Sequence, residues 1–175
     1  MYYEIQTNRL LLRPLNISDL NTVHEYASDY ENSHFMLRLP NQTIEETADF
    51  LTRVTAEWEK SEPAFYEFAV VLNGLQIGHV SVYPDEDREV GELGWILNKR
   101  FQNNGYALES ARAIKDFALN VLHLKKLIAQ CDYRNAPSYR LMEKLGLKLE
   151  SDDGIRIYIK RNETARELTY SLTVD

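Results

Sequence analysis

The sequence predicts one α/β domain of the α+β type, spanning residues 1–175, in which helices flank a mixed, mostly antiparallel central sheet. Three observations lead to this prediction. A chain of 175 residues suits one domain, and 44% hydrophobic with 27% charged residues is typical of a globular protein. Strand-like and helix-like segments follow one another in mixed order, without repeats or low-complexity linkers. Asn73-Gly74, between two β-rich segments, is a strong hairpin signal because both turn positions need positive φ.

The N-terminal third is expected to form a strand and two helices. Residues 8–15 are an apolar run interrupted by a proline, as in an edge strand. A first helix follows with Ser18 as its N-cap. A longer helix begins at Thr43, where Glu46 completes a capping-box pattern. Residues 32–42 join the two helices as an irregular segment.

The middle of the chain changes to the composition and alternation of strands. Aromatic and β-branched residues fill 65–72, and the hairpin turn leads into a return strand over 75–83. An acidic turn at 85–87 precedes a third strand over 90–97. These three segments predict an antiparallel meander.

The C-terminal part is expected to alternate helices and strands. Its predicted elements are a helix over 106–122, a strand over 126–132, a short helix over 135–145, and strand-like pieces around 155–160 and 168–174.

The charge balance bears on the kind of partner. The net charge is −7, from 20 Lys and Arg against 27 Asp and Glu. Because nucleic-acid phosphates need Lys and Arg, this balance disfavours a nucleic-acid partner. An acidic surface attracts cationic substrates such as amines, although the same charge also serves simple solubility.

The composition also bears on location and metals. No window of 18 apolar residues suggests a membrane span, and the N-terminus lacks the features of a secretory signal. One cysteine, Cys131, excludes an internal disulfide and a multi-cysteine zinc site, and it reads as a buried apolar residue. The four histidines are not spaced as a metal pair. We therefore expect a cytoplasmic protein without a metal or a membrane partner.

Residues 98–107, between a predicted strand and a predicted helix, are the most informative segment. Unpaired N–H groups and the helix dipole at a helix start favour a phosphate or pyrophosphate, and Gly105 lets the backbone approach closely. Lys99 and Arg100 lie near the start of the segment, which contains no acid. Alone, Gln-x-x-Gly-x-Ala at 102–107 is a weak pattern, and neither a P-loop nor a dinucleotide fingerprint is present.

Several motifs in order across the chain make the segment more specific. These motifs are Asn-Arg-Leu-x-Leu-Arg-Pro at 8–14, Gly-Glu-Leu-Gly-Trp at 91–95, Gln-x-x-Gly-x-Ala at 102–107, Asn-x-x-Ser at 135–138 and Glu-Lys-Leu-Gly at 143–146. Together they resemble the GNAT acetyltransferase superfamily, and within it the branch of the ribosomal-protein N-terminal acetyltransferases.

This resemblance implies acetyl-CoA as cosubstrate and a sheet splayed between its fourth and fifth predicted strands, 90–97 and 126–132. The backbone amides of 102–107 would hold the pyrophosphate, and the pantetheine arm would lie in the splay. Asn135 would contact that arm, Ser138 would lie near the thioester sulfur, and Lys144 near the outer end. The implied cofactor-binding residues are Trp95, Ile96, Leu97, Gln102, Asn103, Asn104, Gly105, Tyr106, Ala107, Asn135, Ser138 and Lys144.

Acetyl transfer to an amine needs a base, because an alkylammonium has a pKa near 10. Glu92 is the candidate base, and its ordinary alternative is an exposed strand glutamate. In many relatives a tyrosine protonates the departing thiolate, but Met142 occupies that position here. Ser138, one helical turn earlier, is the first candidate for this role and Tyr139 the second. If they have no catalytic role, Ser138 is a residue typical of a helix N-terminus and Tyr139 is an aromatic ring packed against the core.

The expected function is transfer of an acetyl group from acetyl-CoA to a primary amine, by direct attack on the thioester. The acceptor is either a protein N-terminal α-amine or a small-molecule amine, and residues 32–42 are a weak candidate for its specificity. Because Met142 cannot donate a proton, a catalytically weak acyl-CoA-binding regulatory module is an alternative. A module for some other phosphate ligand is a third, and a homodimer is left open.

Overall fold

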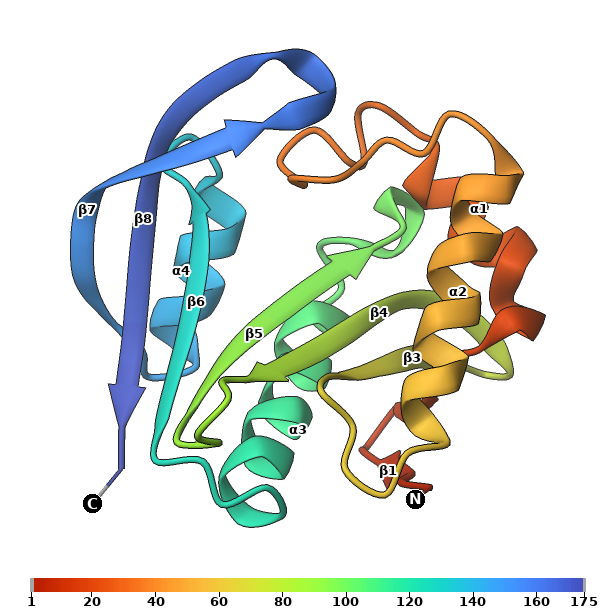
Figure 1. Cartoon of the computed structure of the whole chain (residues 1–175), viewed down its shortest axis with the longest axis horizontal. Helices are drawn as coiled ribbons and strands as arrows, with labels where there is room; N and C mark the ends of the chain where they lie inside the picture. The colour runs from red at the N-terminus through yellow and green to blue at the C-terminus, as the bar shows by residue number, and fades with distance from the viewer. Residues whose placement is uncertain (1, 175) are drawn as a thin grey trace.

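Eight strands form one sheet in residues 2–174, the part of the chain that the computed structural model describes (Figure 1). The strand order is β1-β2-β3-β4-β5-β6-β8-β7, and every neighbouring pair is antiparallel except β5 and β6. The strands are β1 (Ile5–Gln6), β2 (Leu10–Pro14), β3 (Tyr66–Leu72), β4 (Leu75–Pro84), β5 (Val90–Leu97), β6 (Lys126–Asp132), β7 (Lys148–Tyr158) and β8 (Glu163–Thr173). The predicted mixed, mostly antiparallel sheet is confirmed.

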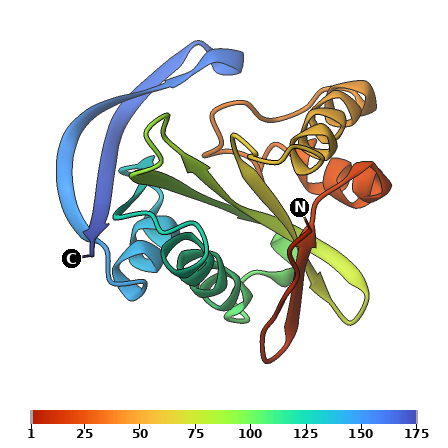
Figure 2. The same cartoon turned by 60° about the horizontal axis from the view of Figure 1, so that its bottom comes forward.

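Helices cover both faces of this sheet. Figure 2 shows α3 and α4 side by side on one face, with α1 and α2 on the other. The α-helices are α1 (Leu20–Ala27), α2 (Ile44–Trp58), α3 (Tyr106–Asn120) and α4 (Ala136–Lys144), and short 3₁₀ turns occupy Ile17–Asp19, Lys99–Phe101 and Ile159–Arg161.

Side-chain caps set where the two N-terminal helices begin. Thr43 caps α2 as predicted, its side chain accepting from the Glu46 backbone N–H. Glu46 does not complete the capping box, because its carboxylate accepts from the Gln42 N–H and pairs with Lys160. Ser18 is not an N-cap: the cap is Asn16, whose side chain accepts from the Ser18 N–H and begins a 3₁₀ turn that leads into α1.

The core lies between the sheet and the helices on its two faces, and aromatic residues form the part beside α3. Phe68 of β3 and Ile114 of α3 are fully buried, and Phe117 packs edge-on against Phe68 with their ring centroids 5.2 Å apart. Trp58 at the end of α2 joins this aromatic cluster and donates from its indole N–H to the Glu67 carbonyl. Burying side chains of this size stabilises the fold by about 1.5–3 kcal/mol each. The position of α3 behind the meander is thus set by aromatic packing.

The sheet opens between β5 and β6. The two strands pair in parallel only from Val90 to Glu92, opposite Lys126 to Ile128. Beyond that point β5 stays with β4 and β6 stays with β8, so the two strands diverge (Figure 1). We call residues 93–97 of β5 and 129–132 of β6 the splay. Its position is the one that the family resemblance implied.

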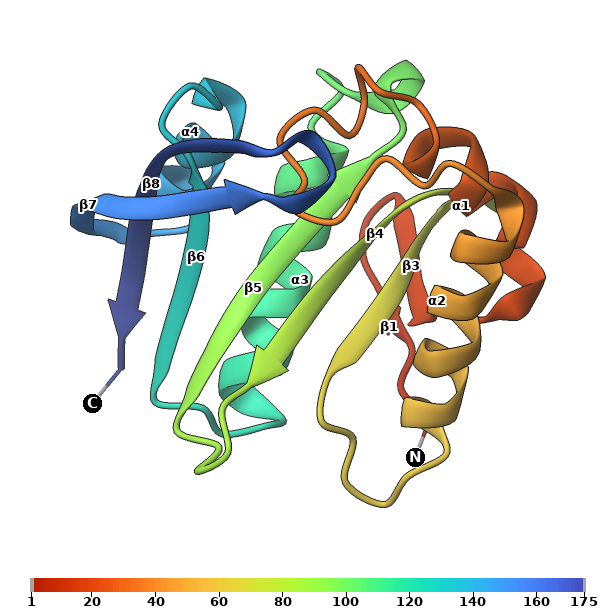
Figure 3. The same cartoon turned by 45° about the horizontal axis from the view of Figure 1, so that its top comes forward.

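The β7–β8 hairpin arches across the molecule and meets the segment between α1 and α2 (Figure 3). Arg156 donates to the Phe35 carbonyl at 3.1 Å, and Lys160 to the Pro40 carbonyl at 2.9 Å. The Tyr158 hydroxyl donates to buried Asp132 of β6 at 2.7 Å. These contacts fix the hairpin on the side of the sheet that carries α1 and α2.

Candidate active site

The loop before α3 presents backbone amides at a helix start. Gly105 is the N-cap of α3 with φ 81°, a left-handed conformation that glycine adopts without strain, and no side chain caps the helix. The Asn104 side chain donates to the Gln102 carbonyl at 2.8 Å, and the Gln102 side chain donates to the Leu97 carbonyl at 3.1 Å. These two hydrogen bonds fix the loop. Residues 102–105 are exposed. The first amides of α3 therefore carry partial positive charge and lack an acceptor from the described chain.

The end of the splay next to this loop brings two predicted residues together. The Trp95 indole N–H on β5 donates to the Ser138 hydroxyl on α4 at 3.2 Å. Asn135 caps α4 and accepts from the Ser138 backbone N–H at 3.4 Å. Burial raises the pKa of the Cys131 thiol on β6 to about 11, and nearby Ser138 opposes this rise. Cys131 is thus a buried neutral thiol. The Ser138 hydroxyl is the polar group at the centre of this end of the splay.

Glu92 lies on β5 directly opposite Tyr83 of β4, at the last residue that pairs with β6. Glu92 is exposed to solvent, and its carboxyl group is partly desolvated by the protein around it. This desolvation, together with the negative charge of Glu167, raises the pKa of Glu92, while Arg156 opposes the rise. A carboxylate with a raised pKa is a better proton acceptor near neutral pH.

The remaining predicted residues occupy different surroundings. Tyr139 is half-buried against the core, and its hydroxyl interacts electrostatically with Tyr170 of β8. Met142 is 1% exposed and belongs to the core. Lys144 is exposed in the last turn of α4, six residues and about 9 Å along the helix from Ser138. The structure therefore groups Trp95 and Ser138, and places Lys144 apart from them.

Sequence reasoning missed a buried polar cluster on the same face as Glu92. Glu67 of β3 is 3% exposed, and its Oε1 accepts from the Tyr83 hydroxyl. Its Oε2 has no hydrogen-bond partner and lies 3.9 Å from His79 Nε2. Burial raises the pKa of Glu67 to about 8 and lowers the pKa of His79 to about 4, so both are neutral at pH 7. The available signal was a single acid in the apolar run 65–72.

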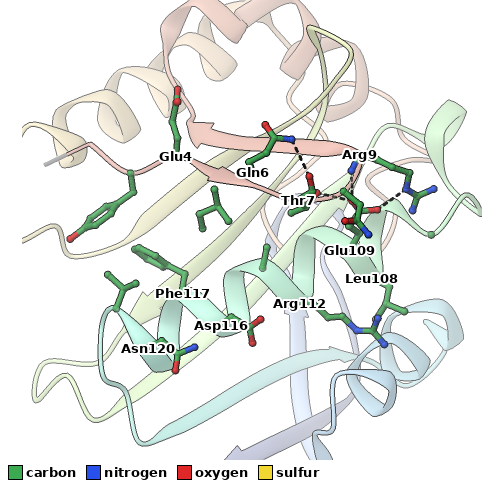
Figure 4. A pocket seen from close by; sticks show the side chains of 16 residues that line it. Glu4, Gln6, Thr7, Arg9, Leu108, Glu109, Arg112, Asp116, Phe117 and Asn120 are labelled. Atoms are coloured by element: carbon green, nitrogen blue, oxygen red, sulfur yellow. Dashed lines mark hydrogen bonds and ion pairs between the residues drawn. The ribbon is translucent and has the colours of Figure 1, made fainter.

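A groove of about 820 Å³ lies at the other side of α3, between that helix and β1 (Figure 4). It is lined by the N-terminal residues 3–9 and by one side of α3, and it meets the 102–107 loop at Gly105. Arg9 and Glu109 stand where the groove and the loop meet. The groove is thus separate from the splay, which lies at β5 and β6.

Comparisons with known proteins agree with this arrangement. The acetyltransferase (GNAT) domain family matches residues 9–148. The uncharacterized N-acetyltransferase YnaD of Bacillus subtilis (strain 168) is 35% identical over 150 residues, 83% of each chain. A GNAT-family acetyltransferase structure from Bacillus anthracis has a TM-score of 0.85 at 30% identity, covering 98% of both chains. RimL, the ribosomal L7/L12 alpha-N-protein acetyltransferase, in complex with coenzyme A, has a TM-score of 0.86 at 16% identity, covering 99% of both chains.

With these matches, the splayed sheet and the uncapped helix start beside it are those of an acyltransferase, and the chain belongs to the GNAT acetyltransferase family. It is an acetyl-CoA-dependent N-acetyltransferase. The resemblance and the enzyme class predicted from the sequence are confirmed. Among residues 2–174, no helix has the length and apolar character needed to cross a membrane.

Proposed function

We propose that this enzyme transfers the acetyl group of acetyl-CoA to a primary amine by direct attack of the amine on the thioester. The observation that carries the proposal is the placement of three features along one splay. Exposed amides lie at one end, Ser138 lies across from Trp95, and Glu92 lies where the strands begin to part. The named function of RimL, an α-N-protein acetyltransferase, supports an amine acceptor.

The residues present fit coenzyme A. The uncapped amides after Gly105 suit its diphosphate, because they donate hydrogen bonds and carry the positive end of the α3 dipole. Alternate residues of β5 beyond Glu92 direct their N–H and C=O groups away from β4 and toward the splay. Those groups suit the amides of a pantetheine arm. Asn135 and Ser138 border the same space from α4, and Lys144 would lie toward its outer end.

Different groups of the protein would then carry out the separate steps of the reaction. When bound, acetyl-CoA supplies an acetyl group on a thiol leaving group. Glu92 takes a proton from the acceptor ammonium, directly or through a water, so that the amine can attack. A β5 backbone N–H that faces the splay stabilises negative charge on the thioester oxygen. The Ser138 hydroxyl, held by Trp95, donates a hydrogen bond to the departing sulfur, with Tyr139 as the reserve donor. The second proton that the nitrogen loses as it becomes an amide ends on this sulfur, so that the thiol leaves and Ser138 or Tyr139 keeps its own proton.

The acceptor enters, in this proposal, from the side of the sheet where the β7–β8 hairpin meets residues 32–42. Glu92 and Tyr83 lie on that face, and Glu167 and Arg156 lie near the Glu92 carboxyl. Both a protein N-terminal α-amine and a small-molecule amine fit these residues. Residues 32–42 and the hairpin are the parts that would tell the two acceptors apart.

Thiol release from acetyl-CoA, followed over a panel of peptides and small amines, tests the proposal. An amine-dependent rate is expected for at least one acceptor, and mass spectrometry should find one added acetyl group on it. Coenzyme A at 100 times its dissociation constant should stabilise the fold by about 2.7 kcal/mol. Binding of coenzyme A without turnover of any amine would instead support the acyl-CoA-binding regulatory module.

A further inference from the structure

The Arg9 side chain connects the β1–β2 hairpin to the 102–107 loop (Figure 4). Its Nε donates to Glu109 Oε2 at 2.7 Å, and its Nη1 donates to the Asn104 carbonyl at 3.0 Å. Its Cζ lies 4.5 Å from the centre of the Tyr106 ring. A Cβ on Gly105 would lie 3.3 Å from Nη2. One guanidinium group therefore contacts Asn104 and Tyr106, on either side of Gly105.

Glu109 would by itself work against an anion at this place. It is the one acid in the first turn of α3, where a diphosphate would bind. Burial raises the pKa of Glu109, but hydrogen bonds from Thr7 and Arg9 and the Arg9 charge outweigh burial, so the net pKa lies below its usual range. The carboxylate is thus ionised at neutral pH. A negative charge this close to a bound diphosphate is repulsive unless a cation neutralises it.

The Arg9–Glu109 pair is poorly suited to a purely stabilising role. The Arg9 side chain is 46% exposed and that of Glu109 is 16% exposed. Ion pairs at exposed positions contribute about 0–1 kcal/mol to stability, and solvent around the Arg9 side of this pair screens it even though Glu109 is mostly buried. Arginine does, however, offer a planar fork that can bind a carboxylate, a carbonyl oxygen and an aromatic face at once. Arg9 makes all three contacts, with the Glu109 carboxylate, the Asn104 carbonyl and the face of Tyr106.

We propose that Arg9 is a positioning residue for the acetyl donor: it holds the 102–107 loop in the shape that presents its amides, and it cancels the charge of Glu109. This inference rests on the proposed binding of the coenzyme A diphosphate to that loop. It assigns a role in donor binding to the Asn-Arg-Leu motif at 8–10, which lies more than ninety residues before the loop in sequence.

The test compares two donors that differ in the diphosphate. The donors are acetyl-CoA and S-acetylpantetheine, which carries the thioester and the arm but no diphosphate. Arg9→Gln should raise the Kd for coenzyme A and the KM for acetyl-CoA about tenfold, which corresponds to about 1.4 kcal/mol. Its kcat/KM with S-acetylpantetheine should stay within twofold of the parent enzyme. Arg53→Gln, at an exposed position on α2, is the matched control and should change neither donor's constants.

A double variant tests the charge argument separately. Arg9→Gln with Glu109→Gln should bind coenzyme A at least threefold more tightly than Arg9→Gln alone, because the unpaired carboxylate is gone. If Arg9→Gln unfolds, Arg9→Lys keeps the charge without the fork and should weaken coenzyme A binding about threefold. Unchanged coenzyme A affinity in the single variants, or equal losses with both donors, would overturn the inference. A parent enzyme that fails to bind coenzyme A would instead overturn the proposed function.

Discussion

At the scale of single residues, two glutamates on one face of the sheet have different surroundings. Glu92 keeps contact with solvent at the edge of the splay, and its pKa is raised by desolvation and by Glu167. Glu67 is enclosed, with Tyr83 as its hydrogen-bond donor and neutral His79 as its neighbour. Solvent access suits Glu92 to exchange protons with a substrate. Glu67 influences instead the stability of the fold.

Glu92→Gln should lower kcat at pH 7 by about 10²–10⁴, because glutamine cannot accept the proton of the acceptor ammonium. Part of the rate should return at high pH, where the amine is free base. In the parent enzyme the acid limb of kcat/KM should lie above pH 4.5, since the Glu92 pKa is raised from that value. Thiol release measured from pH 5 to 10 checks both statements. Glu86→Gln, in the exposed turn between β4 and β5, is the control, and equal rates in all three proteins would show that another group takes the proton.

Glu67→Gln should change how stability depends on pH. Burial raises the pKa of Glu67 in the folded state to about 8, against 4.5 for an exposed glutamate. Between these values the unfolded chain loses this proton and the folded chain keeps it. The Glu67 contribution to the free energy of unfolding is therefore fully present below pH 4.5 and is lost as the pH rises toward 8.

Urea unfolding at pH 5 and pH 8 measures this effect. The parent protein should lose more stability over this interval than Glu67→Gln does, by on the order of 1 kcal/mol or more. Glu59→Gln, at an exposed position after α2, should behave like the parent. Parallel pH profiles for the parent and Glu67→Gln would mean that the carboxyl group ionises normally in the fold.

At the scale of elements, segments specified by local sequence were predicted well. The bounds predicted for β5 and β6 are those observed, and the Asn73-Gly74 turn has the expected positive φ at both residues. The sequence did not predict β1, or the full length of β7 and β8. Their strands are short or rich in polar residues, so their pairing depends on distant partners such as β6. The missed cap at Asn16 has the same cause, because Arg13 and Asp19 organise that turn together.

The loop before α3 makes a prediction about an element. Gly105→Ala should destabilise the fold by about 1 kcal/mol, because φ is 81° and alanine is strained there. It should also raise the KM for acetyl-CoA and leave the KM for the amine unchanged. Gly74→Ala is a matched control with the same φ of 81° and no atom within 4 Å of its new Cβ. It should lose the same stability without any change in KM, whereas equal KM values in both variants would contradict the role of the loop.

At the scale of the whole molecule, the candidate site combines local and distant parts. The amide loop and Glu92 lie in contiguous motifs, so the sequence alone could propose them as candidates. The acceptor side could not be identified in the same way, because it depends on contacts such as Arg156 to Phe35, which are 121 residues apart. Glu67 and Arg9 were missed for the same reason: their roles depend on which residues of other strands or helices face them.

Among the contacts that hold the β7–β8 hairpin, the hydrogen bond between Tyr158 and Asp132 is buried. Burial of Asp132 raises its pKa, but hydrogen bonds from Arg134 and Tyr158 outweigh burial and bring the pKa to about 2. The stabilisation is therefore present above about pH 4 and is lost as the pH falls through 2. Because the hairpin also contacts residues 32–42, its docking couples stability to the shape of the acceptor side.

Tyr158→Phe should accordingly lower the free energy of unfolding at pH 7 by about 1.5–3 kcal/mol, the usual contribution of a hydrogen bond to a charged group. The difference from the parent should shrink below pH 3, because protonated Asp132 no longer needs the phenol. Loosening of the hairpin should raise the KM for the amine and leave the KM for acetyl-CoA unchanged. Tyr133→Phe, at a position 44% exposed beside the same strand end, is the control for loss of a hydroxyl. A rise in the KM for acetyl-CoA, with the amine KM unaffected, would mean that the hairpin serves the donor side of the splay.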